Sequence, residues 1–384
     1  MIVKLKFFEY QFGVDFISKM SIQFPLDPAQ YQILHQIGSS SDADIILARC
    51  IPNNKLVAIK QYDMEITNLT IQKIAQEVTL WSTLSHPNAV KYYGSFCFGS
   101  KIWLLIECID GGSLSDILKD FYPSGINNEV LIASILQKVL LFLDYFHSHQ
   151  QMHRDLKTNK ILVSMDGEIK VCGFCNVSNL IQQGYRKTSR KSVLEFSNYV
   201  APEVINVSTD GKGYSQPADI WSLGIIAYEM ATGKTPYDSM NPVEQMRAII
   251  DSDPPNLPSS CSLVFKDFVS QCLMKSPEKR ATAHKLLKHD FIQTAKDSEY
   301  IETLMTSQLP PLIQRFEYHD QKKSAIIKEN ANMLTKKYEF DFPKTKGSHE
   351  EEKSKNTNLE DPSSVANSHS VKKGRFTISY AQPE

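Results

Sequence analysis

Alternating apolar and polar residues predict a series of β-strands in the first third of the chain. Three runs, at residues 31–37, 42–50 and 55–63, have the period of two that is typical of strands with one buried face. Two further runs, 89–99 and 101–109, follow later in the sequence. Together these runs predict an antiparallel sheet of about five strands.

A helix is predicted between the third and the fourth strand. Over residues 68–84 the apolar positions recur at spacings of three and four, and Asn68 or Thr70 can act as the N-cap. Residues 128–148 are apolar almost all round, which is typical of a helix buried on most sides. Helical patterns also dominate residues 217–292. A sheet lobe followed by a helical lobe predicts an α+β fold with a cleft between the two.

Composition and charge narrow the class of protein. Hydrophobic residues make up 42% of the chain and the net charge is −1, so we expect a globular protein that binds neither nucleic acid nor an anionic membrane. The seven scattered cysteines do not suggest a disulfide framework, and we therefore expect a cytoplasmic protein. No apolar run is expected to cross a membrane.

The two ends of the chain differ in pattern from the central part. Residues 1–26 are expected to form an N-terminal extension, in which Met20 offers a second plausible start. Residues 293–384 are expected to form a C-terminal regulatory tail. From about residue 344 this tail is polar and too poor in apolar residues to fold alone, so the sequence predicts disorder there.

Four short motifs occur in the order found in protein kinases. They are Val57-Ala58-Ile59-Lys60, His153-Arg154-Asp155, Ala201-Pro202-Glu203 and the run from Asp219 to Gly224. On these motifs the chain resembles the sterile-20-like protein kinases over residues 31–292. The resemblance implies a bilobal kinase fold over residues 27–292, with an N-lobe at 27–110 and a C-lobe at 111–292.

The resemblance also implies roles for individual residues in binding ATP and in phosphoryl transfer. Lys60 would pair with Glu77 and contact the ATP phosphates, while Asp155 and Lys157 would be the catalytic residues. The other residues expected to bind ATP are those of the glycine-rich loop, its flanking strands and the hinge: Ile37, Gly38, Ile45, Ala58, Glu107 and Ile109. Glu203 would form a buried ion pair with Arg280, and Asp219 would anchor the C-lobe; these last roles are structural.

Several positions depart from the kinase pattern. The glycine-rich loop keeps only Gly38. The two residues that hold magnesium in the family are replaced by Lys160, in the catalytic loop, and Gly173, in the Asp-Phe-Gly motif. Phe196 stands where family members carry a threonine that contacts the catalytic aspartate. These departures imply that no metal is bound in the usual way.

Within the group, the chain resembles the SPAK and oxidative-stress-responsive kinase branch and the STRAD pseudokinases. Tyr338 and Phe340 resemble a hook that binds an armadillo-repeat scaffold protein. Arg375, Phe376 and Ile378 resemble the docking peptide recognised by SPAK-type regulatory domains. The alternative is that both tail segments are plain amphipathic sequence without a partner.

The favoured hypothesis is therefore a pseudokinase that acts as an adaptor or allosteric regulator of a partner protein kinase, with ATP binding that is weak or independent of magnesium. The runner-up is a weakly active ATP-dependent serine/threonine protein kinase that uses Asp155 and Lys60. A third hypothesis, from a different class, is a redox protein built on the C-x-x-C pair of Cys172 and Cys175.

Overall fold

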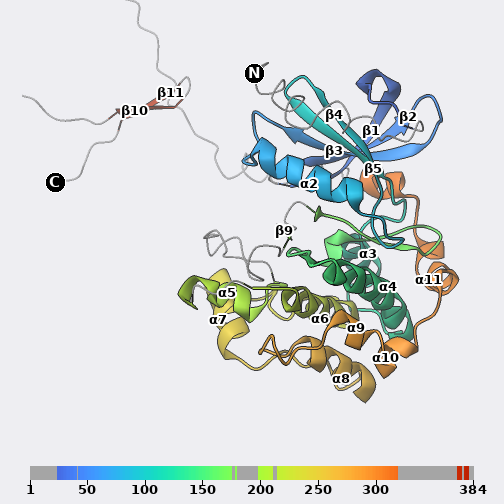
Figure 1. Ribbon diagram of the computed structural model, residues 1–384, viewed down its shortest axis with the longest axis vertical. Helices are drawn as coiled ribbons and strands as arrows, with labels where there is room; N and C mark the ends of the chain where they lie inside the picture. Colours follow the sequence, from blue (N-terminus) through green and yellow to red (C-terminus); the bar gives the residue numbers. More distant parts are fainter. Residues whose placement is uncertain are drawn as a thin grey trace, which may run out of the picture. The chain divides into compact units, whose positions relative to one another are not determined.

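The five expected strands form one antiparallel sheet in the computed structural model (Figure 1). The structure describes residues 24–40, 42–174, 198–210 and 214–318, with short strands at 178–179, 370–373 and 376–379. The sheet has the order β1 (Tyr31–Ser39), β2 (Asp44–Cys50), β3 (Leu56–Asp63), β5 (Lys101–Glu107) and β4 (Tyr92–Phe98). A 3₁₀ turn, η1 (Pro28–Gln30), precedes it. The predicted α+β fold with a five-stranded N-lobe is confirmed.

Helix α2 (Ile71–Thr83) is the helix expected between the third and fourth strands. Thr70 caps it, because its hydroxyl accepts a hydrogen bond from the Lys73 backbone N–H. The buried side chains of α2 include Ile74, Glu77 and Trp81, spaced so that they share one face of the helix. This face brings the charged Glu77 into the interior of the N-lobe.

Strand β3 divides its side chains between two hydrophobic clusters. Val57 and Ile59 belong to a small cluster that also contains Phe24, whose ring stacks on Tyr93. Ala58 and Tyr62 belong to the main core. Since side chains alternate along a strand, Lys60 lies on the same face of β3 as Tyr62.

The C-lobe is mainly helical, with two short two-stranded sheets beneath the N-lobe (Figure 1). Its helices are α3 (Leu114–Phe121), α4 (Glu129–Ser148), α5 (Pro202–Asp210), α6 (Pro217–Thr232), α7 (Pro242–Asp251), α8 (Leu263–Cys272), α9 (Ala283–Leu286) and α10 (Asp290–Gln293). Strands β7 (Ile161–Val163) and β8 (Ile169–Val171) form the hairpin predicted at Asp166-Gly167, and β6 (Gln151–Met152) pairs with β9 (Ser178–Asn179). A 3₁₀ turn, η2 (Thr158–Lys160), leads into β7.

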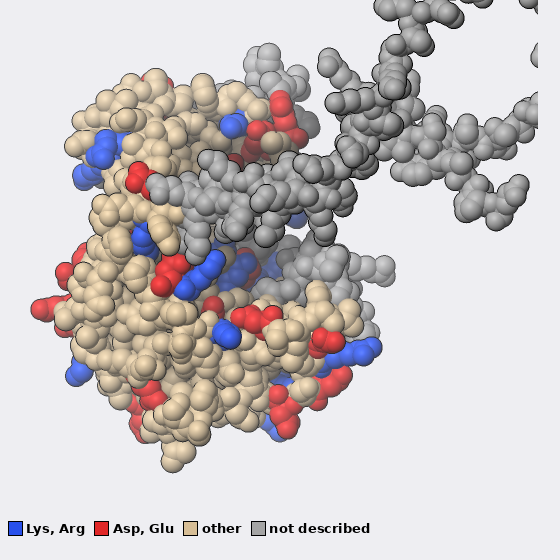
Figure 2. Space-filling view, turned by 180° about the vertical axis from the view of Figure 1, so that it is seen from behind, with Lys and Arg blue, Asp and Glu red and all other residues tan. Residues whose placement is uncertain are grey.

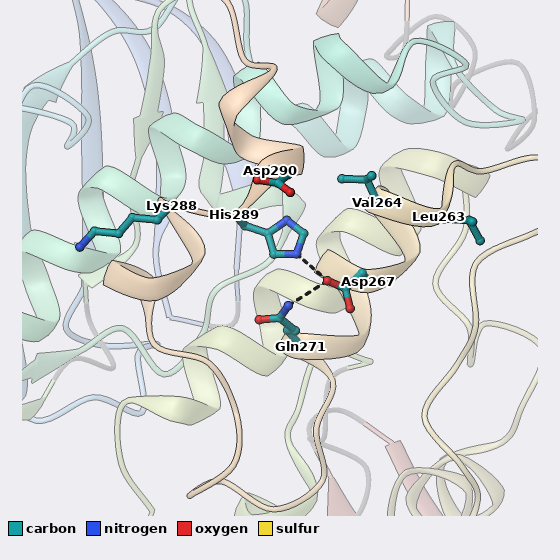
Figure 3. Close-up of a pocket in the computed structure, with 7 residues that line it drawn as sticks. All are labelled: Leu263, Val264, Asp267, Gln271, Lys288, His289 and Asp290. Carbon is teal, nitrogen blue, oxygen red and sulfur yellow. Dashed lines mark hydrogen bonds and ion pairs between the residues drawn. The ribbon is translucent and has the colours of Figure 1, made fainter.

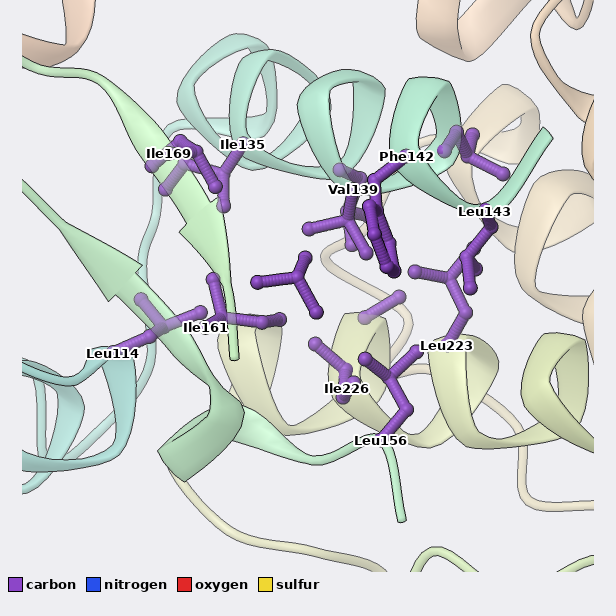
Figure 4. Close-up of a cluster of buried hydrophobic side chains, with 14 of the residues drawn as sticks. Leu114, Ile135, Val139, Phe142, Leu143, Leu156, Ile161, Ile169, Leu223 and Ile226 are labelled. Atoms are coloured by element: carbon purple, nitrogen blue, oxygen red, sulfur yellow. The ribbon is translucent and has the colours of Figure 1, made fainter. Parts of the chain in front are cut away.

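Helices α4 and α6 form the centre of the C-lobe core (Figure 4). The labelled side chains in that cluster are Leu114, Ile135, Val139, Phe142, Leu143, Leu156, Ile161, Ile169, Leu223 and Ile226. They come from both helices, from α3, from the β7–β8 hairpin and, at Leu156, from the catalytic loop. The catalytic loop between β6 and β7 is therefore supported from below by this core.

Helix α4 corrects one expectation from the sequence. Its length and a mean hydropathy of 1.5 over 18 residues are sufficient for a membrane span, although no such run was expected. In the structure 61% of that window is buried inside the protein. A core helix surrounded by other helices meets the same criteria as a membrane span, and this burial explains its apolar composition.

The chain beyond residue 293 continues along the same lobe. Helix α11 (Ser298–Leu304) and the 3₁₀ turn η5 (Thr306–Gln308) pack there; the Ser298 hydroxyl donates to Glu168 at 2.6 Å and the Thr306 hydroxyl donates to the Met165 carbonyl at 2.7 Å. Both contacts are with the turn of the β7–β8 hairpin.

The same segment then reaches the hinge and the N-lobe. The Arg315 guanidinium donates a hydrogen bond to the Gly111 carbonyl, and Leu312 and Arg315 lie against Gly112. Glu317 is 3.7 Å from His35 on β1. We call residues 298–317 the strap, because they contact the C-lobe, the hinge and the N-lobe in turn.

The chain divides into two compact units, residues 1–326 and 327–384. In the second unit, β10 (Ser370–Lys373) and β11 (Phe376–Ser379) form an antiparallel pair, with Ile378 opposite Val371. Phe376 and Ile378 therefore lie on β11. Tyr338, Phe340 and Arg375 lie outside the described residues, as does the extension up to residue 23.

Candidate nucleotide-binding and catalytic cleft

Lys60 and Glu77 form a close ion pair between β3 and α2. The Lys60 Nζ and Glu77 Oε1 atoms are 2.6 Å apart, and the Glu77 side chain is 1% exposed. The Tyr62 hydroxyl donates to the other carboxylate oxygen, Oε2, and its ring lies 5.0 Å from the Lys60 ammonium. The structure thus brings together the pair expected from the sequence and adds Tyr62 as a third member.

The register of the sheet places the expected nucleotide-binding residues in neighbouring rows. Gly38 pairs with Ile45, and Ile45 pairs with Lys60. In the next row Ala58 lies opposite Ile106, the residue before the hinge. Ile37 packs, partly buried, against the main core.

The loop after Gly38 is closed by its own hydrogen bonds. The Ser40 backbone N–H donates to the Ala43 carbonyl at 2.9 Å. The Ser40 hydroxyl oxygen lies 3.1 Å from the Ala43 amide nitrogen and 3.4 Å from that of Asp42, and accepts from both. In a kinase this loop covers the ATP phosphates. Here two of its amides are already engaged by Ser40.

The hinge connects the lobes through Glu107 and Ile109. The Glu107 backbone N–H donates to the Lys91 carbonyl at 2.9 Å, and the Ile109 carbonyl accepts from Gly112 at 3.2 Å. Burial raises the pKa of the intervening Cys108 to about 12, so its thiol is protonated at neutral pH. These hydrogen bonds fix the hinge backbone at the end of strand β5, next to the row of Ala58 and Ile106.

The catalytic loop is fixed by a buried polar network around Asp219. The Asp219 carboxylate accepts the backbone N–H groups of His153 and Arg154, both at 2.8 Å, and lies 2.9 Å from the His147 ring nitrogen. Burial opposes ionisation of Asp219, but these hydrogen bonds outweigh it and lower the pKa of the carboxyl group. Asp155 lies on this loop, with Lys157 Nζ 3.1 Å from its Oδ1.

The side chain of Lys160 lies directly against Gly173. A Cβ atom on residue 173 would lie 2.7 Å from Lys160 Cδ, and Gly173 has a φ of +90°. Two hydrogen bonds hold the Lys160 backbone. The Lys160 N–H donates to the Lys157 carbonyl, and the Lys160 carbonyl accepts from the Cys172 N–H. The lysine stem therefore fills the space beside Gly173. Cys175, the partner of Cys172 in the C-x-x-C pair, lies outside the described residues.

Phe174 packs beneath helix α2. Its ring is fully buried, 5.3 Å from Trp81 on α2 and 5.7 Å from His153 of the catalytic loop. The Trp81 indole N–H donates to the Val90 carbonyl at 2.7 Å. This aromatic contact connects α2 with the catalytic loop.

A model of the protein kinase domain matches residues 31–292 of the chain. The chain belongs to the protein kinase family. The matched range is the one over which the sequence resembles the kinases and includes all four motifs, and the Lys60–Glu77 pair agrees with the match.

Similar curated proteins are named kinases. The serine/threonine-protein kinase ppk11 of Schizosaccharomyces pombe is 39% identical over 269 residues, which cover 70% of this chain and 83% of ppk11. The serine/threonine-protein kinase fray1 of Dictyostelium discoideum is 35% identical over 299 residues, covering 76% of this chain and 51% of fray1. Germinal center kinase 3 of Caenorhabditis elegans is 32% identical over 345 residues, covering 84% of this chain and 57% of that kinase.

These relatives agree with the sterile-20-like resemblance of the sequence. The chain spans 51% of fray1, 30% of the related kinase fray2 and 57% of germinal center kinase 3, so about a third to a little over half of those longer proteins.

One polar cluster of the kinase domain was missed by sequence reasoning. The Tyr199 hydroxyl donates to Glu229 Oε2 at 2.5 Å and lies 3.0 Å from the Thr158 hydroxyl. Burial raises the pKa of Glu229. The cluster joins the segment just before α5 to the catalytic loop; Phe196, slightly earlier in the sequence, lies outside the described residues. No local sequence pattern could pair residues on three separate elements.

The kinase domain also has a surface pocket of about 410 Å³ at the base of the C-lobe (Figure 3). It is lined by Leu263, Val264, Asp267, Gln271, Lys288, His289 and Asp290. His289 Nε2 is 2.9 Å from Asp267 Oδ2, and hydrogen bonds from His289 and Gln271 lower the pKa of Asp267. Since α8 and α10 lie far from the N-lobe, this pocket is separate from the cleft (Figure 1).

Charged side chains of both signs are interspersed over the face of the domain seen from behind (Figure 2). On that face lysines and arginines do not gather into a single basic area. This distribution agrees with the near-zero net charge of the whole chain.

Proposed function

We propose that this protein is a pseudokinase of the sterile-20-like group, which acts as an adaptor or allosteric regulator of a partner protein kinase. The observation that carries the proposal is the contact between Lys160 and Gly173 in the cleft. In active protein kinases a catalytic-loop asparagine and the aspartate of Asp-Phe-Gly hold the magnesium ions at these two positions.

The residues present do not fit a magnesium ion. Gly173 offers no side chain, and Lys160 places an ammonium group where the ion would need a neutral or negative ligand. A unit charge and a divalent cation about 4 Å apart repel each other by about 8 kcal/mol at an effective dielectric constant of about 20. We therefore derive no catalytic step through a metal.

Binding of ATP without magnesium is compatible with the remaining residues. The Lys60–Glu77 pair is assembled, and Lys160 adds a second ammonium group that could contact a phosphate as a point charge. The internal bonds of Ser40 reduce what the glycine-rich loop can offer. We therefore propose weak, magnesium-independent binding through the hinge and the two lysines.

The regulatory role follows the resemblance to the SPAK and oxidative-stress-responsive branch and to STRAD. In this proposal the kinase domain is presented to a partner kinase in the cytoplasm. Tyr338 and Phe340 would bind an armadillo-repeat scaffold, and Arg375, Phe376 and Ile378 would bind a SPAK-type regulatory domain.

A weakly active serine/threonine kinase is the second candidate. The contact between Lys157 and Asp155 supports it, because both residues of the kinase catalytic loop are retained and lie together. The relatives fray1 and ppk11, which are serine/threonine-protein kinases by name, support it equally.

A phosphotransfer assay with a general protein substrate separates the two candidates. The full chain is assayed with ATP and magnesium, and again with manganese, beside Asp155→Asn as the matched control. The pseudokinase proposal expects equal, background incorporation for both proteins. Incorporation that Asp155→Asn abolishes would establish the kinase alternative instead.

Thermal denaturation with ATP tests the nucleotide part separately. We expect ATP with a chelator to raise the melting temperature as much as ATP with magnesium does. Stabilisation that appears only with magnesium would overturn the proposed binding mode, whatever the phosphotransfer assay shows.

A further inference from the structure

Glu77 accepts hydrogen bonds from two residues of β3, Lys60 and Tyr62. Each carboxylate oxygen has its own donor: Oε1 faces the Lys60 ammonium at 2.6 Å and Oε2 accepts from the Tyr62 hydroxyl. Tyr62 is fully buried and Glu77 is 2% exposed. The Glu77 carboxylate is thus buried away from water, and its charge is stabilised by the Lys60 ammonium and by the hydrogen bond from Tyr62.

The two donors differ in what they lose if α2 moves outward. A lysine ammonium on a flexible stem can turn toward water or toward a phosphate. The Tyr62 ring is fixed by burial in the main core, so its hydroxyl would lose the acceptor of its proton, since Lys60 can only donate. A buried donor that loses its acceptor opposes the movement that separates them.

From this asymmetry we propose that Tyr62 is a positioning residue that holds α2 inward in the absence of nucleotide, metal and partner. The Lys60–Glu77 pair is then assembled permanently, and any partner that contacts α2 meets a preformed face. Tyr62 also keeps Glu77 satisfied when Lys60 turns to a ligand. This inference stands whether or not the chain transfers phosphate.

Burial also ensures that the hydroxyl can act in this way at all physiological pH values. Desolvation raises the pKa of Tyr62 far above its ordinary value, with the neighbouring Glu77 acting in the same direction and Lys60 opposing it. The phenol therefore stays protonated and remains a donor.

A second contact of α2 could hold the helix by itself and has to be distinguished. Trp81 bonds to the Val90 carbonyl and packs on Phe174, which anchors the last turn of α2. If this anchor alone were sufficient, removal of the Tyr62 hydroxyl would leave α2 unchanged.

The test is hydrogen exchange of the α2 amides in the full chain, without nucleotide or metal. Tyr62→Phe keeps the ring beneath Lys60 and removes only the hydroxyl. We expect exchange over Ile71–Thr83 to become about tenfold faster, which corresponds to about 1.4 kcal/mol. Tyr92→Phe is the matched control: it removes a hydroxyl bonded to Ser95 at 2.8 Å, in a ring that also lies near Trp81, and should leave α2 exchange unchanged.

A double-mutant cycle with Glu77→Met, which has no oxygen to accept from the Tyr62 hydroxyl, distinguishes positioning from a general loss of core stability. If the hydroxyl acts through the carboxylate, Tyr62→Phe should add little to Glu77→Met. Unchanged α2 exchange in Tyr62→Phe, fully additive effects, or an equal rise across β3 and β5 would each overturn the proposal. Because neither ATP nor a substrate is present, none of these outcomes depends on the proposed pseudokinase function.

Discussion

The side chain of Lys160 occupies the space that any side chain on residue 173 would need. Cδ and Cε of Lys160 lie 2.7 and 3.1 Å from the position of a Cβ atom on Gly173. The two departures from the kinase pattern, Lys160 and Gly173, are therefore in contact with each other. A change at either residue alters the environment of the other, which makes single and double variants informative.

Gly173→Asp alone is expected not to create a metal site. A side chain at φ +90° strains the backbone, and the flexible stem of Lys160 has to shift to make room, so the variant should fold with reduced stability. Its carboxylate would lie within reach of the Lys160 ammonium and form an ion pair with it. Melting temperatures with ATP should consequently show no additional rise on adding magnesium.

Combining Gly173→Asp with Lys160→Asn should restore a magnesium-dependent rise. A stabilisation of about 1 kcal/mol would raise the melting temperature by about 2–4 °C for a domain of this size. Lys160→Asn alone serves as the control. Peptide phosphorylation should stay at background, because Phe196 remains; strong activity of the double variant would contradict this second expectation.

The Arg315 contact with the hinge is expected to contribute to stability. Arg315→Met keeps much of the apolar stem and leaves the buried Gly111 carbonyl without its donor, at a cost of about 1–3 kcal/mol. Urea unfolding of the full chain measures the loss. Glu317→Gln, which weakens the exposed pair with His35, should cost less than about 1 kcal/mol. If the two variants lost equal free energy of unfolding, the Arg315–Gly111 hydrogen bond would not be what stabilises the contact between the strap and the hinge.

Stability should fall on mild acidification because His153 is buried as the neutral ring. Desolvation lowers the pKa of His153, whose Nε2 is 2.9 Å from the Cys172 carbonyl oxygen. In the unfolded chain the imidazole titrates near pH 6.5, so below about pH 6.5 the unfolded state binds a proton that the folded state does not. The free energy of unfolding is therefore highest above about pH 6.5 and decreases as the pH falls below that value.

Urea unfolding at about pH 7.5, 6.5 and 5.5 checks this dependence. Burial lowers the pKa of His86 as well, so both histidines contribute in the same window. His153→Gln and His86→Asn should each flatten part of the decrease. A free energy of unfolding that stays constant or rises between about pH 6.5 and 5.5 would contradict the expectation.

Features that depend on local periodicity could be predicted from the sequence. The alternation Ala58, Lys60, Tyr62 and the helical spacing of Ile74, Glu77 and Trp81 place the β3 and α2 faces correctly. The same alternation already put Tyr62 on the side of Lys60, so its contact with Glu77 was within reach of sequence reasoning.

Features that depend on contacts distant in sequence could not be predicted. The strap reaches Gly111 from Arg315, 204 positions away, and no spacing rule connects them. The contact of Lys160 with Gly173 requires the positive φ of the glycine, which the sequence permits without specifying. The closure of the glycine-rich loop by Ser40 likewise depends on the loop conformation.

The tail hook gives the last prediction. Glu317, near the end of the described part of the first unit, lies beside β1 of the N-lobe, and Tyr338 and Phe340 follow later in the sequence. A scaffold that contacts both α2 and the hook would gain from the effective concentration of the second contact. Burying an aromatic anchor often contributes at least about 2 kcal/mol at an interface. Changing Tyr338 and Phe340 together to alanine should therefore weaken binding of an armadillo-repeat scaffold at least about tenfold, or about 1.4 kcal/mol, in calorimetry. Arg375→Ala with Phe376→Ala is the matched control and should leave that affinity unchanged; if the hook variant also binds as tightly as the unmodified chain, residues 338–340 are only a linker.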